Sequence, residues 1–184
     1  TALGSDALGN NTTASENTAV GYSASGNNTT GLQNVAIGHN TARLTTTGRE
    51  NTTVGKGAMY YNTTGSYNTS LGKEALQNNT TASNNTAVGH QAGYANTTGT
   101  FNTFVGNVAG NSNTTAQRNT FIGHYAGEGN TTGGYGTFVG QNSGYLMTTG
   151  SKNTILGSFS GNQGGLDIRT SSNNIVLSDG DGNV

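Results

Sequence analysis

The chain has 184 residues, a formal net charge of −1, and only 15 charged side chains, seven basic and eight acidic. Seven cations cannot make a strongly basic face, so the composition excludes a basic nucleic-acid-binding protein. No apolar run approaches the roughly 20 residues that span a bilayer, and we expect no membrane insertion. The chain contains no cysteine, so it holds neither a disulfide framework nor a thiolate metal site.

The chain is built from one strictly periodic sequence repeat. The segment N-T-A-V-G begins at Asn17 and N-V-A-I-G at Asn34, which gives a period of seventeen, and the series continues to Asn153 without insertion or deletion. Residues 1–16 are one more unit that lacks its first residue. We therefore divide the chain into ten units over 1–169 and a divergent segment, 170–184, with a last strand predicted at 174–178.

Each unit, numbered from its Asn, predicts one coil of a β-solenoid. Recurrent Gly and Asn exclude a helix, whereas β-branched residues at positions 2 to 4 favour a short strand. The glycine that is always at position 5 indicates a corner. We expect a second short strand at positions 12–14. The fold class is therefore all-β, a parallel β-solenoid (β-roll) of ten seventeen-residue coils about 4.8 Å apart.

Position 4 is always aliphatic and position 8 always small, so we expect both to form the core. The predicted structural core column at position 4 is Leu3, Val20, Ile37, Val54, Leu71, Val88, Val105, Ile122, Val139 and Leu156. Such a thin core favours closure by partner chains, as in a homotrimeric fibre. The column of Phe104, Phe121 and Phe138 at position 3 is then either packing between chains or a surface binding strip.

The N-T-A-V-G-x-x-A segments at Asn17 and Asn85 resemble the head repeats of trimeric autotransporter adhesins, and Asn34 to Gly38 is the closest match. That resemblance implies a parallel β-roll that trimerises side by side, although the family repeat is shorter. The N-T-A-V-G and N-T-T-G arrays also look like those of bacteriophage tail-fibre proteins. Residues 172–184 resemble the segment leading into the C-terminal chaperone domains of those fibres, which implies a further region downstream.

No catalytic or metal-binding group emerges from the repeats. His39, His90 and His124 all occupy position 6, which we expect to face solvent, at separations of roughly 10 to 14 Å. The carboxylates are scattered and suggest no acid–base pair. Asp179-Gly-Asp181-Gly-Asn183 opens like a calcium loop, but a polar turn is the favoured interpretation. We predict no enzyme, no cofactor and no metal.

Asn-x-Ser/Thr sequons recur along the chain and raise N-glycosylation of the coil edges as an alternative. The competing interpretation is that Asn-Thr-Thr suits a turn in a ladder. The candidate glycosylation sites at position 12 are Asn11, Asn28, Asn62, Asn79, Asn96, Asn113 and Asn130.

We predict a structural shaft segment of an extracellular fibre, located outside the cell or on a virion surface. Its partner would be the chain itself, as a homotrimer or as an end-to-end filament. One alternative is a module that binds a cell-surface glycan. Another is an ice-binding solenoid that uses the Thr-Thr column at positions 13 and 14, where strand alternation would display one Thr per coil. The contacts to test for a glycan are Tyr22, Tyr60, Tyr94 and Tyr145.

Overall fold

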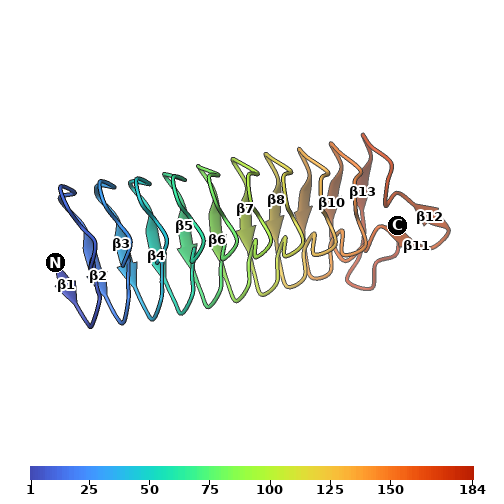
Figure 1. Cartoon of the computed structure of the whole chain (residues 1–184). Coiled ribbons are helices and arrows are strands. Elements are labelled where there is room, and N and C mark those ends of the chain that lie inside the picture. Colours follow the sequence, from blue (N-terminus) through green and yellow to red (C-terminus); the bar gives the residue numbers. More distant parts are fainter.

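The computed structural model describes residues 1–184 and is all-β, with no helix (Figure 1). Eleven strands form one parallel sheet in chain order, which confirms the predicted parallel β-solenoid. A separate antiparallel hairpin joins β11 (Asn162–Gln163) to β12 (Leu166–Asp167). The sheet strands are β1 (Ala2–Leu3), β2 (Thr18–Val20), β3 (Val35–Ile37), β4 (Thr52–Val54), β5 (Thr69–Leu71), β6 (Thr86–Val88), β7 (Thr103–Val105), β8 (Thr120–Ile122), β9 (Thr137–Val139), β10 (Thr154–Leu156) and β13 (Ile175–Leu177).

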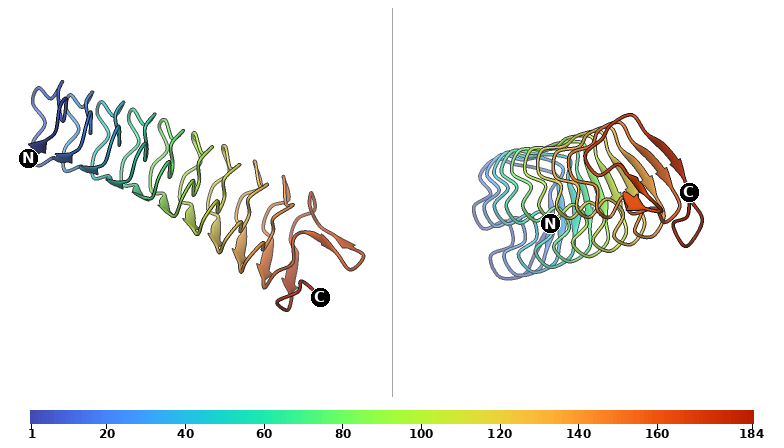
Figure 2. Two further views of the ribbon diagram at one scale, coloured as in Figure 1. Left: turned by 90° about the horizontal axis from the view of Figure 1, so that it is seen from below. Right: turned by 90° about the vertical axis from the view of Figure 1, so that its right-hand side faces the viewer.

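Each strand pairs with the equivalent strand of the next coil, position by position. Thr86 of β6 faces Thr103 of β7, for example, and the register never slips. The last step is longer than the repeat, because Thr154 of β10 pairs with Ile175 of β13 and the β11–β12 hairpin takes up the extra chain. The last predicted strand is therefore part of the same sheet. Figure 2 shows the coils stacked in a gently curved row, with the hairpin at the C-terminal end.

The prediction of a second strand at positions 12–14 is wrong, yet the coils are hydrogen-bonded on every side. Of 123 backbone hydrogen bonds, 102 involve residues outside the strands. The amide of Met59 donates to the carbonyl of Ala75 in the next coil, and the amide of Thr63 to that of Thr80. Contact between coils therefore does not depend on the sheet alone.

Left-handed backbone shapes the corners. Positions 7, 9 and 17 have positive φ in most coils, usually without glycine, as at Glu74 (60°), Leu76 (47°) and Asn84 (62°). The position 5 glycines, Gly4 to Gly140, have φ between 130° and 139°, a region that only glycine adopts readily. A Cβ at Gly106 would also lie 2.3 Å from the carbonyl oxygen of Gly123. The predicted corner at position 5 is confirmed.

The predicted core column at position 4 is wrong, because those side chains lie on the outer face of the sheet. Position 3 points inward instead: Phe104 is fully buried, whereas Ile37 is 40% exposed. Successive side chains in a strand face opposite sides, so one inward residue at position 3 puts positions 2 and 4 outside. The whole column is half-buried or exposed: Leu3, Val20, Ile37, Val54, Leu71, Val88, Val105, Ile122, Val139 and Leu156.

The small residues at position 8 are buried in every coil except the first and the last, as predicted, and the phenylalanines at position 3 complete the core of the chain itself. The ring centroids of Phe121 and Phe138 stack 4.6 Å apart, and Phe104 lies 5.6 Å from Phe121. The aromatic column is therefore neither packing between chains nor a surface strip. Its rings fill the interior of consecutive coils, so this core is closed without a partner chain.

In the coils that hold a large core side chain at position 3 or position 9, the other of these two positions is small. Where position 3 is phenylalanine, position 9 is glycine, and a Cβ added at Gly127 would lie 2.4 Å from Cδ2 of Phe121. Where position 3 is small, as at Ser70, position 9 carries the bulk as Leu76, which is fully buried. In these coils a large side chain at one position is thus matched by a small residue at the other, as close packing requires.

The N-terminal coils have the thinnest core. One cluster of 15 buried residues runs from Met59 to Val176, whereas the first coils hold only a separate cluster of four alanines: Ala19, Ala24, Ala36 and Ala42. These coils depend mainly on hydrogen bonds.

The volume exchange predicts compensation between two substitutions. We expect Phe121→Ala to lower the free energy of unfolding by about 3–5 kcal/mol, because it leaves a cavity. Gly127→Leu alone should also destabilise, because the new side chain would overlap the Phe121 ring. The double variant reproduces a small residue at position 3 with leucine at position 9. It should lose clearly less than the sum of the two single losses in urea unfolding, and simple additivity would contradict the exchange.

Candidate functional site

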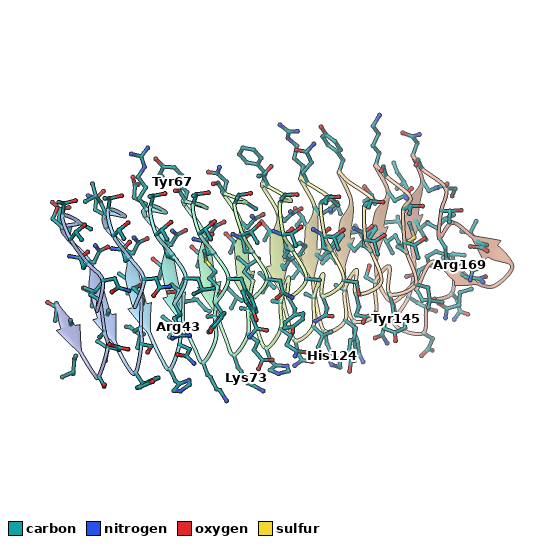
Figure 3. All side chains as sticks on the ribbon, in the orientation of Figure 1. Arg43, Tyr67, Lys73, His124, Tyr145 and Arg169 are labelled. Carbon is teal, nitrogen blue, oxygen red and sulfur yellow. The ribbon has the colours of Figure 1, made fainter.

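Two ridges of long side chains run along opposite edges of the stack. Figure 3 shows Tyr67, at position 17, on one edge; along the other lie Arg43, Lys73, His124 and Tyr145. The Arg118 guanidinium lies 5.4 Å from the ring centroids of both Phe101 and Tyr135. These contacts join neighbouring coils through exposed side chains.

Polar pairs between coils dominate the second ridge. Arg43 Nη1 donates to the Tyr60 hydroxyl at 2.9 Å, a hydrogen bond that raises the pKa of Arg43. Gln91 donates to Glu74 at 2.9 Å, and this bond lowers the pKa of the Glu74 carboxyl. The only salt bridges, Lys73–Glu74 and Asp167–Arg169, lie at the surface, where such pairs add little stability.

The three histidines are exposed, as predicted for position 6. His39 stacks on Tyr22 with ring centroids 5.3 Å apart, and His124 lies 4.0 Å from the Tyr125 centroid. No group of three or more His, Cys, Asp or Glu side chains is placed to hold a metal ion.

The largest cavity is an open groove of about 560 Å³ beside the last coils. Tyr125 and Tyr145 meet edge-on along it, with centroids 5.8 Å apart. The side chains of Gln141, Ser158 and Asp181 also line the groove and have no hydrogen-bond partner within the chain. The groove therefore offers aromatic rings beside free amide, hydroxyl and carboxylate groups.

The Asp179 segment is a closed turn. One carboxylate oxygen of Asp179 accepts from the amides of Asp181 and Asn183, and the other accepts from Asn183 Nδ2, all at 2.9 Å. The bond from the Asn183 side chain, followed by the backbone bonds, lowers the pKa of Asp179. The carboxylate is occupied as a turn cap, in agreement with the polar-turn interpretation.

The four tyrosines proposed as glycan contacts do not form one strip. Tyr145 lines the large groove, and Tyr60 lines a second cavity of about 210 Å³ with Tyr61 and Glu74. Tyr22 is exposed at position 6, and Tyr94 is half-buried several coils away from Tyr145.

The prediction that the asparagines at position 12 are glycosylation sites is wrong, because their side chains are buried or half-buried. Six of the seven are no more than 1% exposed, and Asn11 in the first coil is half-buried. Their Nδ2 groups are the atoms that a glycan would modify, and they donate hydrogen bonds inside the coil. A sugar there is incompatible with the fold. The seven are Asn11, Asn28, Asn62, Asn79, Asn96, Asn113 and Asn130.

These asparagines form one of two amide ladders that close the coils. In one coil, Asn68 Nδ2 at position 1 and Asn79 Nδ2 at position 12 both donate to the carbonyl of Ala82 at position 15, at 2.9 and 3.0 Å. Asn79 Nδ2 also donates to Asn62 Oδ1 of the preceding coil at 2.9 Å. Likewise, the backbone N–H of Asn85 in the next coil donates to Asn68 Oδ1. The ladders thus bind each coil to itself and to its neighbours.

The position 12 ladder is interrupted at Thr45. Asn28 Oδ1 in the preceding coil is buried without a hydrogen-bond partner. In the following coil, Asn62 Nδ2 reaches Thr45 Oγ1 only at 3.4 Å. The shorter side chain therefore leaves one acceptor unpaired.

The Thr-Thr column faces outward with both of its members, since no strand forms there. Thr63 at position 13 is half-buried and donates its hydroxyl to the carbonyl of Thr80 in the next coil at 3.0 Å. Thr64 at position 14 is exposed. One free hydroxyl per coil therefore remains on this side, at position 14. Strand alternation also predicted one displayed threonine per coil, but the reason is that the position 13 hydroxyl is hydrogen-bonded to the next coil.

No protein-family model matches the chain, and neither do any curated proteins or solved structures. No helix long and apolar enough to cross a membrane is present.

The interrupted ladder predicts a stabilising substitution. Thr45→Asn should pair Asn28 Oδ1 and raise the free energy of unfolding by about 1 kcal/mol. The reverse change at an intact rung, Asn96→Thr, should lower it by about 1–3 kcal/mol, because polar groups that are now bonded would be left buried and unpaired. Thr47→Asn, at exposed position 14, is the control and should change little. Equal effects of Thr45→Asn and Thr47→Asn in thermal unfolding would contradict a role for the ladder.

Proposed function

We propose that the chain is a non-enzymatic structural shaft segment of an extracellular fibre, of the phage tail-fibre or adhesin-like kind. The observation that supports this proposal is the hydrogen bonding between successive coils along the whole stack. Neighbouring coils are joined by strand pairing, by backbone hydrogen bonds outside the sheet and by the two amide ladders. A column bonded on every side resists bending at any one coil and sets a fixed length for each unit.

The buried glycines and asparagines belong to this role. The position 5 glycines allow neighbouring coils to approach closely. The asparagine side chains donate hydrogen bonds to backbone carbonyls that the coil buries, such as that of Ala82. A shaft would hold whatever lies beyond it at a set distance, outside the cell or on a virion surface, the location that the resemblance implies.

The proposal predicts that length follows the number of units. Duplicating residues 51–135, which are five units, should lengthen the particle by about 24 Å at the strand spacing of a parallel sheet. Electron microscopy with gold labels at both termini measures this distance. The control is the same insertion with one residue deleted from each duplicated unit, which breaks the register and should not extend the rod. An unchanged distance in the first variant would contradict the shaft.

A separate experiment tests whether the chain lies in the stalk of a surface fibre. Antibodies against the chain should label the stalk of fibres on intact particles or cells, between their base and their tip. Labelling confined to a soluble cell fraction would overturn the proposal.

A second candidate function, glycan binding, is supported by the groove beside Tyr125 and Tyr145. Aromatic rings next to free amides, hydroxyls and a carboxylate suit a hydroxyl-rich ligand, because the rings stack on sugar faces while the polar groups bond to sugar hydroxyls.

The groove predicts selective loss of sugar binding. On a printed glycan array, Tyr145→Ala should reduce binding at least tenfold. Tyr135→Ala, which removes a similarly exposed tyrosine away from the groove, should leave it unchanged. Absence of binding by the unaltered chain, or equal loss in both variants, would argue against this second function.

A further inference from the structure

An apolar stripe runs the length of the outer sheet face. It consists of the position 4 side chains from Leu3 to Leu156, continued by Leu177 of β13. Even inside the stack these side chains remain partly open, with Ile122 39% and Leu156 41% exposed. Positions 1 to 5 hold no charged residue in any coil. The stripe is therefore a continuous neutral surface.

The fold of one chain does not account for the stripe. The core is complete on the other side of the strands, at positions 3, 8 and 9. Position 2 shares the outer face and is threonine in most coils, such as Thr69, Thr86 and Thr103. A strand of this kind thus accepts a hydroxyl-bearing side chain on the same face, yet position 4 is aliphatic in every coil. Strand propensity alone does not explain that restriction, and contiguous exposed apolar surface marks an interaction site.

The dimensions of the stripe fit a partner of the same repeat. Eleven strands about 4.8 Å apart and about 10 Å long give a face on the order of 500 Å², or about 1,000 Å² buried in total when two such faces meet. That total reaches the roughly 1,000 Å² expected of a specific interface. A partner that fills the stripe along its whole length must repeat its own side chains at the coil spacing, and a second copy of this chain does so.

We infer that the apolar stripe is the lateral interface between copies of this chain, with sheet packed on sheet. The inference rests on the proposed fibre role and adds to it the surface through which shafts associate. The face is uncharged, so two copies meet without electrostatic repulsion. Position 4 side chains of one copy would interdigitate with those of the next, as in the packing of two β-sheets.

The absence of cysteine makes the inference directly testable. Single cysteines replace Val20, Val88 or Val139, which lie near one end, in the middle strand and near the other end of the stripe. A short bismaleimide cross-linker then reports which positions meet. Parallel copies should cross-link at all three sites, whereas antiparallel copies should cross-link only at Val88→Cys. Thr98→Cys, which is exposed at position 14 outside the sheet, is the control. Its yield of cross-linked product should be lower than that of every stripe cysteine that cross-links. Stripe cysteines that link no better than this control would overturn the inference.

Sedimentation provides an independent measurement. The unaltered chain should sediment with twice the mass of 18.6 kDa, because two faces meet in the proposed interface. Val88→Lys with Val105→Lys should reduce that mass to one chain, while the circular dichroism spectrum stays that of the folded solenoid. Thr98→Lys with Thr115→Lys should leave the mass unchanged. A monomer at all concentrations would overturn the inference without affecting the length measurement, and thermal hysteresis from such a monomer would identify the threonine–aliphatic face as ice-binding instead.

Discussion

The convergence of two asparagine amides on one carbonyl is the interaction on which the rest of the structure depends. The side-chain amides of Asn68 and Asn79, from positions 1 and 12 of one coil, both donate to the carbonyl of Ala82 at position 15 and so close the coil. The same asparagines then bond to their counterparts in neighbouring coils. A closed coil has little room for apolar side chains, so polar groups must be satisfied inside it. The ladders meet that need, and they fix the length of the coil.

The closed coil also sets the size of the core. Only one side chain of each short strand points inward, and it shares its space with positions 8 and 9. Phe121 therefore needs glycine at position 127, whereas the bulky Leu76 lies in a coil whose position 3 is the small Ser70. Within the seventeen-residue repeats the core changes by such paired substitutions at constant coil length. The one longer step puts its extra residues into the β11–β12 hairpin, so that Asn174 still pairs with Asn153 across it.

The exposed surfaces of the solenoid are the parts of the chain that are free to contact other molecules. The buried side chains hold the coils together, so recognition is left to the exposed surfaces: the ridges, the groove beside Tyr145, the column of free threonine hydroxyls and the apolar stripe. Of these surfaces, the stripe alone extends over the whole sheet with the period of the chain. A rod with such a stripe is suited to lateral association along its axis, and its length is proportional to the number of coils.

The sequence by itself determined the period, the strand at positions 2 to 4, the corner at Gly106 and its equivalents, and the exposed histidines. Each of these depends on local backbone preference or on strict repetition. The tertiary structure alone decided which strand face is inside. Alternation puts Thr103 and Val105 on one side of β7 and Phe104 on the other. The sequence of a three-residue strand does not determine which of these two sides faces solvent. Closure of the coil turned Phe104 inward and, through the ladders, buried asparagines such as Asn96 that look like surface sequons in the sequence.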